Sequence, residues 1–301
     1  FALFCKNTQK VMDRLQESEL ILNDDGSVYH LKLRPEHIAS TIILVGDPQR
    51  VEIVSGFFDR VDVKIQNREI ITHTGYYKSK RISVLSTGMG TDNIDIVINE
   101  LDALVNIDLN TRQIKKEKTP LNLIRLGTSG AIQPDIPVNS FIVSSHALGI
   151  DGLLNFYSGN NPAFDNKMAV AFIKHSNWPE IMAKPYVVKA SEALLKQYGN
   201  ELLSGITATA PGFYGPQGRT LRLSPRIEDL NQRLESFEYN GLRISNFEME
   251  SSALYGLSAL LGHNALTICV AIANRHHKEY SKNSKTHIGL LIKHVLDRFA
   301  G

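Results

Sequence analysis

The chain has 301 residues, an apolar fraction of 43% and a formal net charge of +2, with basic and acidic residues mixed along the sequence. This balance disfavours a nucleic-acid-binding protein, and no apolar run approaches the roughly 18 residues of a membrane-spanning helix. Cys5 and Cys269 are too few and too far apart in sequence to suggest a disulfide framework or a zinc site, so we expect a globular cytoplasmic protein that binds neither nucleic acid nor a membrane.

Short apolar segments rich in β-branched residues recur after the polar first 28 residues, and several of them run into glycine. Such segments predict buried strands, and the glycines predict turns at the strand ends. The predicted strands are residues 41–45, 81–86, 121–126, 141–143 and 267–272. The predicted turns that follow the first three of them are residues 46–48, 88–90 and 127–130.

Helical periodicity separates these strands. Thr91 or Asp92 is a suitable N-cap for a helix in which apolar residues from Ile94 to Leu104 recur every three or four positions. Residues 251–261 and 286–299 predict two further helices, and the polar segment 106–120 predicts a solvent-exposed loop. Alternating strands and helices predict a single three-layer α/β domain with a central mixed sheet, in which ligands gather at the carboxyl ends of strands.

The segment Phe213-Tyr214-Gly215-Pro216-Gln217-Gly218-Arg219 is the clearest indication of a ligand. The amide of Gln217 offers a donor and an acceptor, and the guanidinium of Arg219 offers donors in a fixed fork. Phe213 supplies an aromatic ring for stacking. These three residues predict a pocket for the edge and face of a flat heterocycle.

Two arginines are candidates for an anion site. Arg50 lies one turn into a helix that follows Gly46, where backbone N–H groups suit an anion, although an ordinary strand–turn–helix junction is the simpler explanation. Arg125 lies inside an apolar strand and needs a partner if it is buried. An anion beside Thr128 and a structural pair with a carboxylate explain it equally well. Residues 88–90 lack the third glycine of a dinucleotide-binding fingerprint.

Met249 and Glu250 directly precede the predicted helix 251–261. A carboxylate near a helix N-terminus is favourable in itself, and it is equally suited to accept hydrogen bonds from sugar hydroxyls. A methionine suits the apolar face of a sugar, although methionines belong more commonly to the core. Arg68, in Asn67-Arg68-Glu69, has no distinguishing feature of its own.

Several short motifs follow one another in an order and spacing that resemble the nucleoside phosphorylase-I superfamily and, within it, the uridine phosphorylases. The resemblance covers roughly residues 28–275 and implies a nucleoside phosphorylase domain over residues 28–301, preceded by an N-terminal extension over residues 1–27. The motifs are VYHLKL, VGDPQRV, NRE, STGMG, RLGTSGAIQP, FYGPQGR, FEMES and ANR. The order Gly215-Pro216 reverses the more familiar Pro-Gly of this family.

The resemblance implies a site in three parts, with Arg50, Arg125 and Glu250 as the catalytic residues. It also implies a homo-oligomer built of dimers, in which Arg68 and His30 reach the site of a neighbouring subunit. The phosphate part would comprise Gly46, Arg50, Arg68, Arg125 and Thr128; the ribose part His30, Thr128, Met249 and Glu250; and the base part Phe213, Gln217 and Arg219. No metal or other cofactor is implied, because inorganic phosphate is the co-substrate.

The implied reaction is the reversible phosphorolysis of uridine to uracil and ribose 1-phosphate. Purine-specific members of the family place an aspartate where this chain has Asn274, which disfavours a purine nucleoside phosphorylase. A nucleosidase of the same fold uses water and has no need of three phosphate-binding arginines. A catalytically silent nucleoside-binding or storage protein should have lost site residues, and none is missing here.

Overall fold

The computed structural model describes residues 14–301, so Cys5 lies outside the described residues. Twelve strands form one mixed sheet in the order β11-β12-β10-β8-β13-β7-β1-β4-β3-β2, with β14 paired to β13 and β9 to β8. The sheet comprises β1 (Thr41–Val45), β2 (Arg60–Asn67), β3 (Ile70–Tyr77), β4 (Lys80–Ser86), β7 (Asn122–Ala131), β8 (Phe141–Gly149), β9 (Tyr186–Lys189), β10 (Leu203–Thr209), β11 (Glu238–Tyr239), β12 (Leu242–Glu248), β13 (Asn264–Asn274) and β14 (Glu279–Tyr280).

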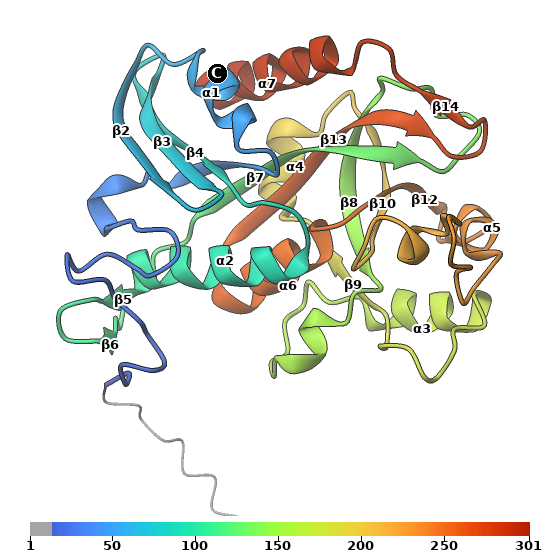
Figure 1. Ribbon diagram of the computed structural model, residues 1–301, viewed down its shortest axis with the longest axis horizontal. Helices are drawn as coiled ribbons and strands as arrows, with labels where there is room; N and C mark the ends of the chain where they lie inside the picture. Colours follow the sequence, from blue (N-terminus) through green and yellow to red (C-terminus); the bar gives the residue numbers. More distant parts are fainter. Residues whose placement is uncertain (1–13) are drawn as a thin grey trace, which may run out of the picture.

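Helices cover both faces of this sheet (Figure 1). α2 and α6 pack against each other on one face, while α7 packs against β13 from the opposite face. The α-helices are α1 (Gln49–Ser55), α2 (Thr91–Asn106), α3 (Asn166–His175), α4 (Glu192–Tyr198), α5 (Leu230–Glu235), α6 (Ser251–Leu261) and α7 (Ser284–Ala300), with short 3-10 turns η1 (Pro35–His37), η2 (Leu153–Phe156) and η3 (Gly215–Gln217). The predicted α/β class, with a mixed sheet flanked by helices, is confirmed.

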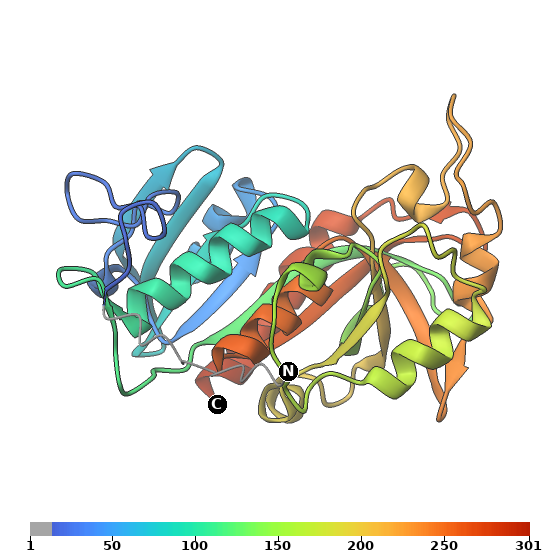
Figure 2. The same cartoon turned by 90° about the horizontal axis from the view of Figure 1, so that it is seen from below.

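Strand β7 is longer than predicted. Residues 127–130 are strand rather than a turn, because their backbone groups pair with β13 and then with β12, where Ala131 lies opposite Asn246. That last pairing joins the two ends of the series β12-β10-β8-β13-β7, so these five strands form a closed ring within the larger sheet. The ring brings the end of β12 beside β7, although the two strands are far apart in sequence (Figure 2).

Two other sequence predictions are wrong in detail. Segment 106–120 is exposed but is not an irregular loop, because β5 (Ile107–Asp108) and β6 (Gln113–Ile114) form a short antiparallel hairpin within it. Helix α2 begins at Thr91 with Gly90 as its N-cap, and neither Thr91 nor Asp92 caps it. The rest of α2 agrees with the predicted periodicity, because Ile94, Leu101 and Leu104 are fully buried.

The first described residues of the chain pack against this hairpin. Leu20 is buried, and its carbonyl oxygen accepts a hydrogen bond from the Arg112 guanidinium. The backbone N–H of Leu15 donates to the carbonyl oxygen of Arg112 at 2.9 Å. Within residues 14–301, no helix has both the length and the apolar character needed to cross a membrane.

Candidate active site

A cleft of about 800 Å³ lies where β1, β4 and β12 end. Ligand sites of α/β proteins are expected at such carboxyl ends of strands. Nine of the residues singled out from the sequence line the cleft: Gly46, Arg50, Arg125, Thr128, Phe213, Gln217, Arg219, Met249 and Glu250. The chain therefore brings the predicted anion, sugar and heterocycle residues together in one cavity, whereas His30 and Arg68 do not line it.

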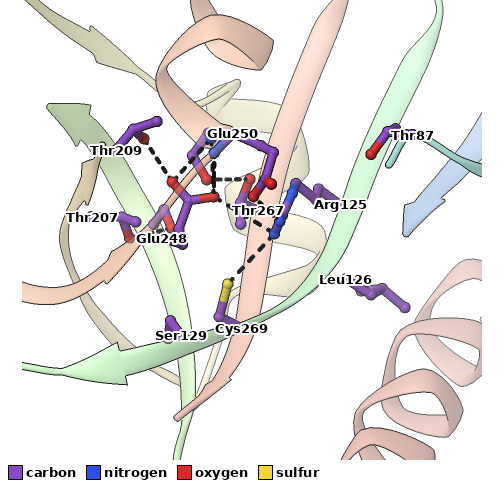
Figure 3. Close-up of polar contacts among 12 residues, drawn as sticks. Thr87, Arg125, Leu126, Ser129, Thr207, Thr209, Glu248, Glu250, Thr267 and Cys269 are labelled. Carbon is purple, nitrogen blue, oxygen red and sulfur yellow. Dashed lines mark hydrogen bonds and ion pairs between the residues drawn. The ribbon is translucent and has the colours of Figure 1, made fainter. Parts of the chain in front are cut away.

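Arg125 lines the cleft and is only 4% exposed. Its Nη2 forms an ion pair with a carboxylate oxygen of Glu250, and its Nη1 lies 3.7 Å from Glu248 and 3.8 Å from the sulfur of Cys269 (Figure 3). Burial alone would lower the pKa of Arg125, but the two carboxylates outweigh it and raise that pKa. The carboxylate partner that the sequence allowed for Arg125 is therefore present, as Glu250.

Gly127 leaves the room that Arg125 occupies. A Cβ atom built on Gly127 would lie 1.9 Å from Nη1 of Arg125 and 2.9 Å from the sulfur of Cys269. Both contacts are far closer than van der Waals packing allows. Any larger residue at position 127 must therefore displace the guanidinium of Arg125 or the β13 side chain beside it.

Glu250 lies at the junction of β12 and α6, where its backbone is the N-cap of α6. Its carboxylate accepts a hydrogen bond from the backbone N–H of Gly90 at 2.8 Å, in addition to the ion pair with Arg125. Burial raises the pKa of Glu250, and the charge of Arg125 opposes that shift. The φ angle of 96° at Gly90, which glycine adopts without strain, presents this N–H to the carboxylate.

Glu248 is a buried carboxylate to which the sequence analysis assigned no role. It accepts hydrogen bonds from the hydroxyl of Thr209 at 2.6 Å and from the backbone N–H groups of Glu250 and Ser251 at 3.0 Å (Figure 3). Glu248 thus fixes the start of α6 and with it the backbone of Glu250. The only sequence signal for Glu248 is its position two residues before Glu250, at the end of β12.

Arg50, from the first turn of α1, lies at the same end of the cleft as Arg125. Its Nη1 donates to the carbonyl oxygen of Leu126 at 3.2 Å. Burial lowers the pKa of Arg50, and the positive charge of Arg125 lowers it further. Two guanidinium groups that repel each other in a partly dry cavity form a site that an anion stabilises.

The base loop, defined as residues 213–219, contributes Phe213, Gln217 and Arg219 to the lining of the cleft. Nη1 of Arg219 donates to the side-chain oxygen of Gln217 at 2.7 Å and to the carbonyl oxygen of Phe213. The guanidinium lies 3.8 Å from the centroid of the Phe213 ring, so the two groups stack. Burial and the nearby charge of Arg275 lower the pKa of Arg219 to about 10. These three predicted residues form one planar, polar and aromatic wall.

Arg275 contacts the backbone of the base loop. The sequence did not predict it as a functional residue. Its Nη2 donates to the carbonyl oxygen of Gln217 at 3.0 Å. Asn274, at the end of β13, points away from the cleft: its amide nitrogen donates to the carbonyl oxygens of Gln133 and Ile136 at 3.0 and 2.8 Å. No acidic side chain is therefore supplied from position 274, and the amide there has a structural role.

His30 and Arg68 form a separate surface cluster beside α2. His30 pairs with Glu100 at 2.6 Å, and the amide of Asn67 donates to the carbonyl oxygen of His30 at 2.8 Å. Arg68 lies over the ring of Tyr29, with its guanidinium carbon 5.7 Å from the ring centroid. The two residues are thus close to each other, while neither lines the cleft.

The chain is similar in sequence to curated nucleoside phosphorylases. A uridine phosphorylase of Thermococcus kodakarensis is 29% identical over 287 residues, which cover 93% of this chain and 90% of the relative. A DeoD-type purine nucleoside phosphorylase of Bacillus cereus is 32% identical over 240 residues, which cover 79% of this chain and 83% of the relative.

Two solved structures are similar in fold. A nucleoside phosphorylase of Trypanosoma brucei, described as showing uridine phosphorylase activity, has a TM-score of 0.83 at 30% identity and covers 93% of this chain and 98% of its own. A uridine phosphorylase of Phytophthora capsici has a TM-score of 0.68 at 22% identity, with coverage of 95% and 98%, and that likeness concerns the fold alone. The Phosphorylase superfamily model matches residues 40–298, from the start of the central sheet to the last turn of α7, and the chain belongs to that superfamily.

Proposed function

We propose that this protein is a uridine phosphorylase, which converts uridine and inorganic phosphate to uracil and ribose 1-phosphate. The observation that carries the proposal is a single cleft lined by Arg50 and Arg125, by Glu250, which pairs with Arg125, and by the hydrogen-bonded pair Gln217–Arg219. These three groups suit the phosphate, the ribose and the base of the reacting pair. The curated and structural relatives named as uridine phosphorylases support the same substrate.

Phosphate binds between Arg50 and Arg125, where its charge relieves the repulsion between the two guanidinium groups. Thr128 adds a hydroxyl group at the cleft wall, and the turn after β1 adds backbone N–H groups near Gly46. Phosphate is itself the nucleophile, so the chain needs no Ser or Cys nucleophile and no cofactor. The protein contributes position and electrostatic stabilisation.

Glu250 orients the ribose. The positive charge of Arg125 and the N–H of Gly90 both favour the ionised carboxylate, which then accepts hydrogen bonds from the 2′- and 3′-hydroxyls. Met249 packs against the apolar face of the sugar. As the glycosidic bond breaks, the ribose becomes oxocarbenium-like, and the phosphate held below C1′ stabilises that positive charge.

The base loop selects uracil and stabilises it as it leaves. Gln217 offers a donor and an acceptor to the edge of the ring, and Arg219 offers donors to an oxygen on which negative charge accumulates. Uracil is an adequate anionic leaving group, so no acid is needed at position 274. The Asn274 amide donates its hydrogen bonds to the carbonyl oxygens of Gln133 and Ile136, so it does not donate to a base in the cleft. This argues against a purine as substrate, since a purine requires proton donation to N7.

The direct test is incubation with uridine in the presence and absence of phosphate, with uracil and ribose 1-phosphate as measured products. We expect both products only when phosphate is present. Uracil released without phosphate would indicate a nucleosidase. Release of hypoxanthine from inosine in place of uracil from uridine would instead indicate a purine nucleoside phosphorylase.

Gly127→Ala tests the contribution of Arg125 without removing it. The new methyl group occupies the space of Nη1 of Arg125, so we expect a large rise in the KM for phosphate and a fall in kcat. Overpacking of this kind costs about 1–3 kcal/mol of stability. Gly289→Ala is the matched control, because a Cβ built on Gly289 meets nothing within 4 Å. Unchanged phosphate kinetics in Gly127→Ala would contradict the assignment.

A further inference from the structure

A second cavity, of about 710 Å³, shares the base loop with the cleft. Tyr214, Gly215 and Pro216 line this second cavity, whereas Phe213 and Gln217 line the cleft, and Arg219 lines both. The base loop is therefore a common wall between the two cavities. A molecule bound in either cavity therefore contacts the backbone of the base loop. Both cavities also share the side chain of Arg219.

The second cavity is positively charged. Arg219, Arg222 and Arg226 line it, and none of the described residues that line it is acidic. Across residues 14–301, Arg222 and Arg226 form no ion pair and no side-chain hydrogen bond, and of the nitrogens of Arg219 only Nη1 forms one. Three guanidinium groups without a carboxylate partner favour an anionic ligand.

The remaining lining is apolar. Trp178 and Met182 form one side, and the indole N–H is already satisfied by the carbonyl oxygen of Ala183 at 3.0 Å. Leu221 and Leu223 form the outer rim and are 71% and 80% exposed. Large aliphatic side chains exposed at the rim of a cavity are typical of a surface that a ligand covers. The volume is in the range of pockets that hold one small organic ligand.

We infer that this second cavity binds a small amphipathic anion: an apolar chain or ring system that carries one carboxylate. The apolar part lies against Trp178 and Met182, and the carboxylate pairs with Arg222 and Arg226. The same carboxylate attracts Arg219, whose hydrogen bond to Gln217 belongs to the base site. Occupation of the second cavity therefore weakens uracil binding, and uracil weakens binding of the anion by the same factor. This coupling, but not the site itself, rests on the proposed function.

Trp178 is the only tryptophan of the chain, so its fluorescence reports on this cavity directly. The experiment is a titration with decanoate, below its micelle concentration, compared with decyltrimethylammonium, which carries the same chain and the opposite charge. We expect a saturable change in Trp178 emission with decanoate only. The variant Arg222→Ala/Arg226→Ala should bind decanoate about tenfold more weakly, because the charge-assisted contacts are lost. Arg243→Ala, at an arginine that pairs with Asp135, should bind it normally.

Equal binding of the cation, or full decanoate affinity in the double variant, would overturn the inference. If Trp178 emission changes with protein concentration but not with decanoate, the cavity is covered by a second copy of the chain. That result would also overturn the inference. Repeating the titration with saturating uracil tests the coupling, for which we expect a several-fold weaker affinity. If uridine is not a substrate, the titration without uracil still decides whether the anion site exists.

Discussion

Arg125→Ala is expected to abolish the phosphate-dependent release of uracil, with kcat/KM lower by at least about 10²–10³-fold, the loss typical of removing one preorganised donor from a transition state. In the proposed function Arg125 binds phosphate, and its charge opposes the rise that burial causes in the pKa of Glu250, so its loss affects the nucleophile and the sugar together. The measurement is the steady-state rate over a range of phosphate and uridine concentrations. Arg125→Lys should retain part of the activity, because it keeps the charge and loses the forked geometry.

The same substitution leaves Glu248 and Glu250 buried without their cationic partner. Breaking a buried ion pair on one side costs about 3–5 kcal/mol of stability, so a fall in activity alone does not separate catalysis from folding. The double variant Arg125→Ala/Glu250→Gln removes one stranded charge and should recover much of the lost melting temperature. It should remain inactive. A stable double variant with near-normal phosphate kinetics would refute the role of Arg125.

The fold class was predictable because its signals are local. Apolar β-branched segments that run into glycine indicated β1, β4 and the first half of β7, and the periodicity of residues 94–104 indicated α2. The extension of β7 through residues 127–131 was not predictable, because glycines in a strand usually indicate a turn. Here they are kept in the strand by pairing with β13 and β12, which is information about distant parts of the chain.

The candidate site was predictable in its residue types and less so in its contacts. Sequence reasoning left Arg125 with two equal explanations, an anion or a carboxylate partner. The structure shows Glu250 as the partner, which was itself predicted to bind the sugar, so one contact joins residues predicted for the phosphate and ribose parts of the site. Neither the space that Gly127 provides nor the hydrogen bonds of Glu248 has a local sequence signal strong enough to identify it.

Arg68→Ala mixed with Arg125→Ala is expected to regain activity that neither variant has alone. Arg68 lies outside the cleft of its own subunit, near His30, and we propose that both residues complete the cleft of a neighbouring subunit. In a mixed dimer, one cleft then carries both substitutions and the other carries neither. Random exchange of subunits makes about half of the dimers mixed, and each mixed dimer has one intact cleft out of two. About one quarter of all clefts are then intact, so about one quarter of wild-type activity should return.

The control for this experiment is a mixture of Arg125→Ala with Glu250→Gln. Both of these residues line the same cleft, so every cleft in a mixed dimer remains defective and no activity should return. Measuring kcat at saturating phosphate as a function of the mixing ratio distinguishes restored clefts from a general stabilisation of weak dimers, because restoration peaks at equal amounts. Full activity of Arg68→Ala on its own, or a mixture no more active than its parents, would exclude a cleft shared between subunits.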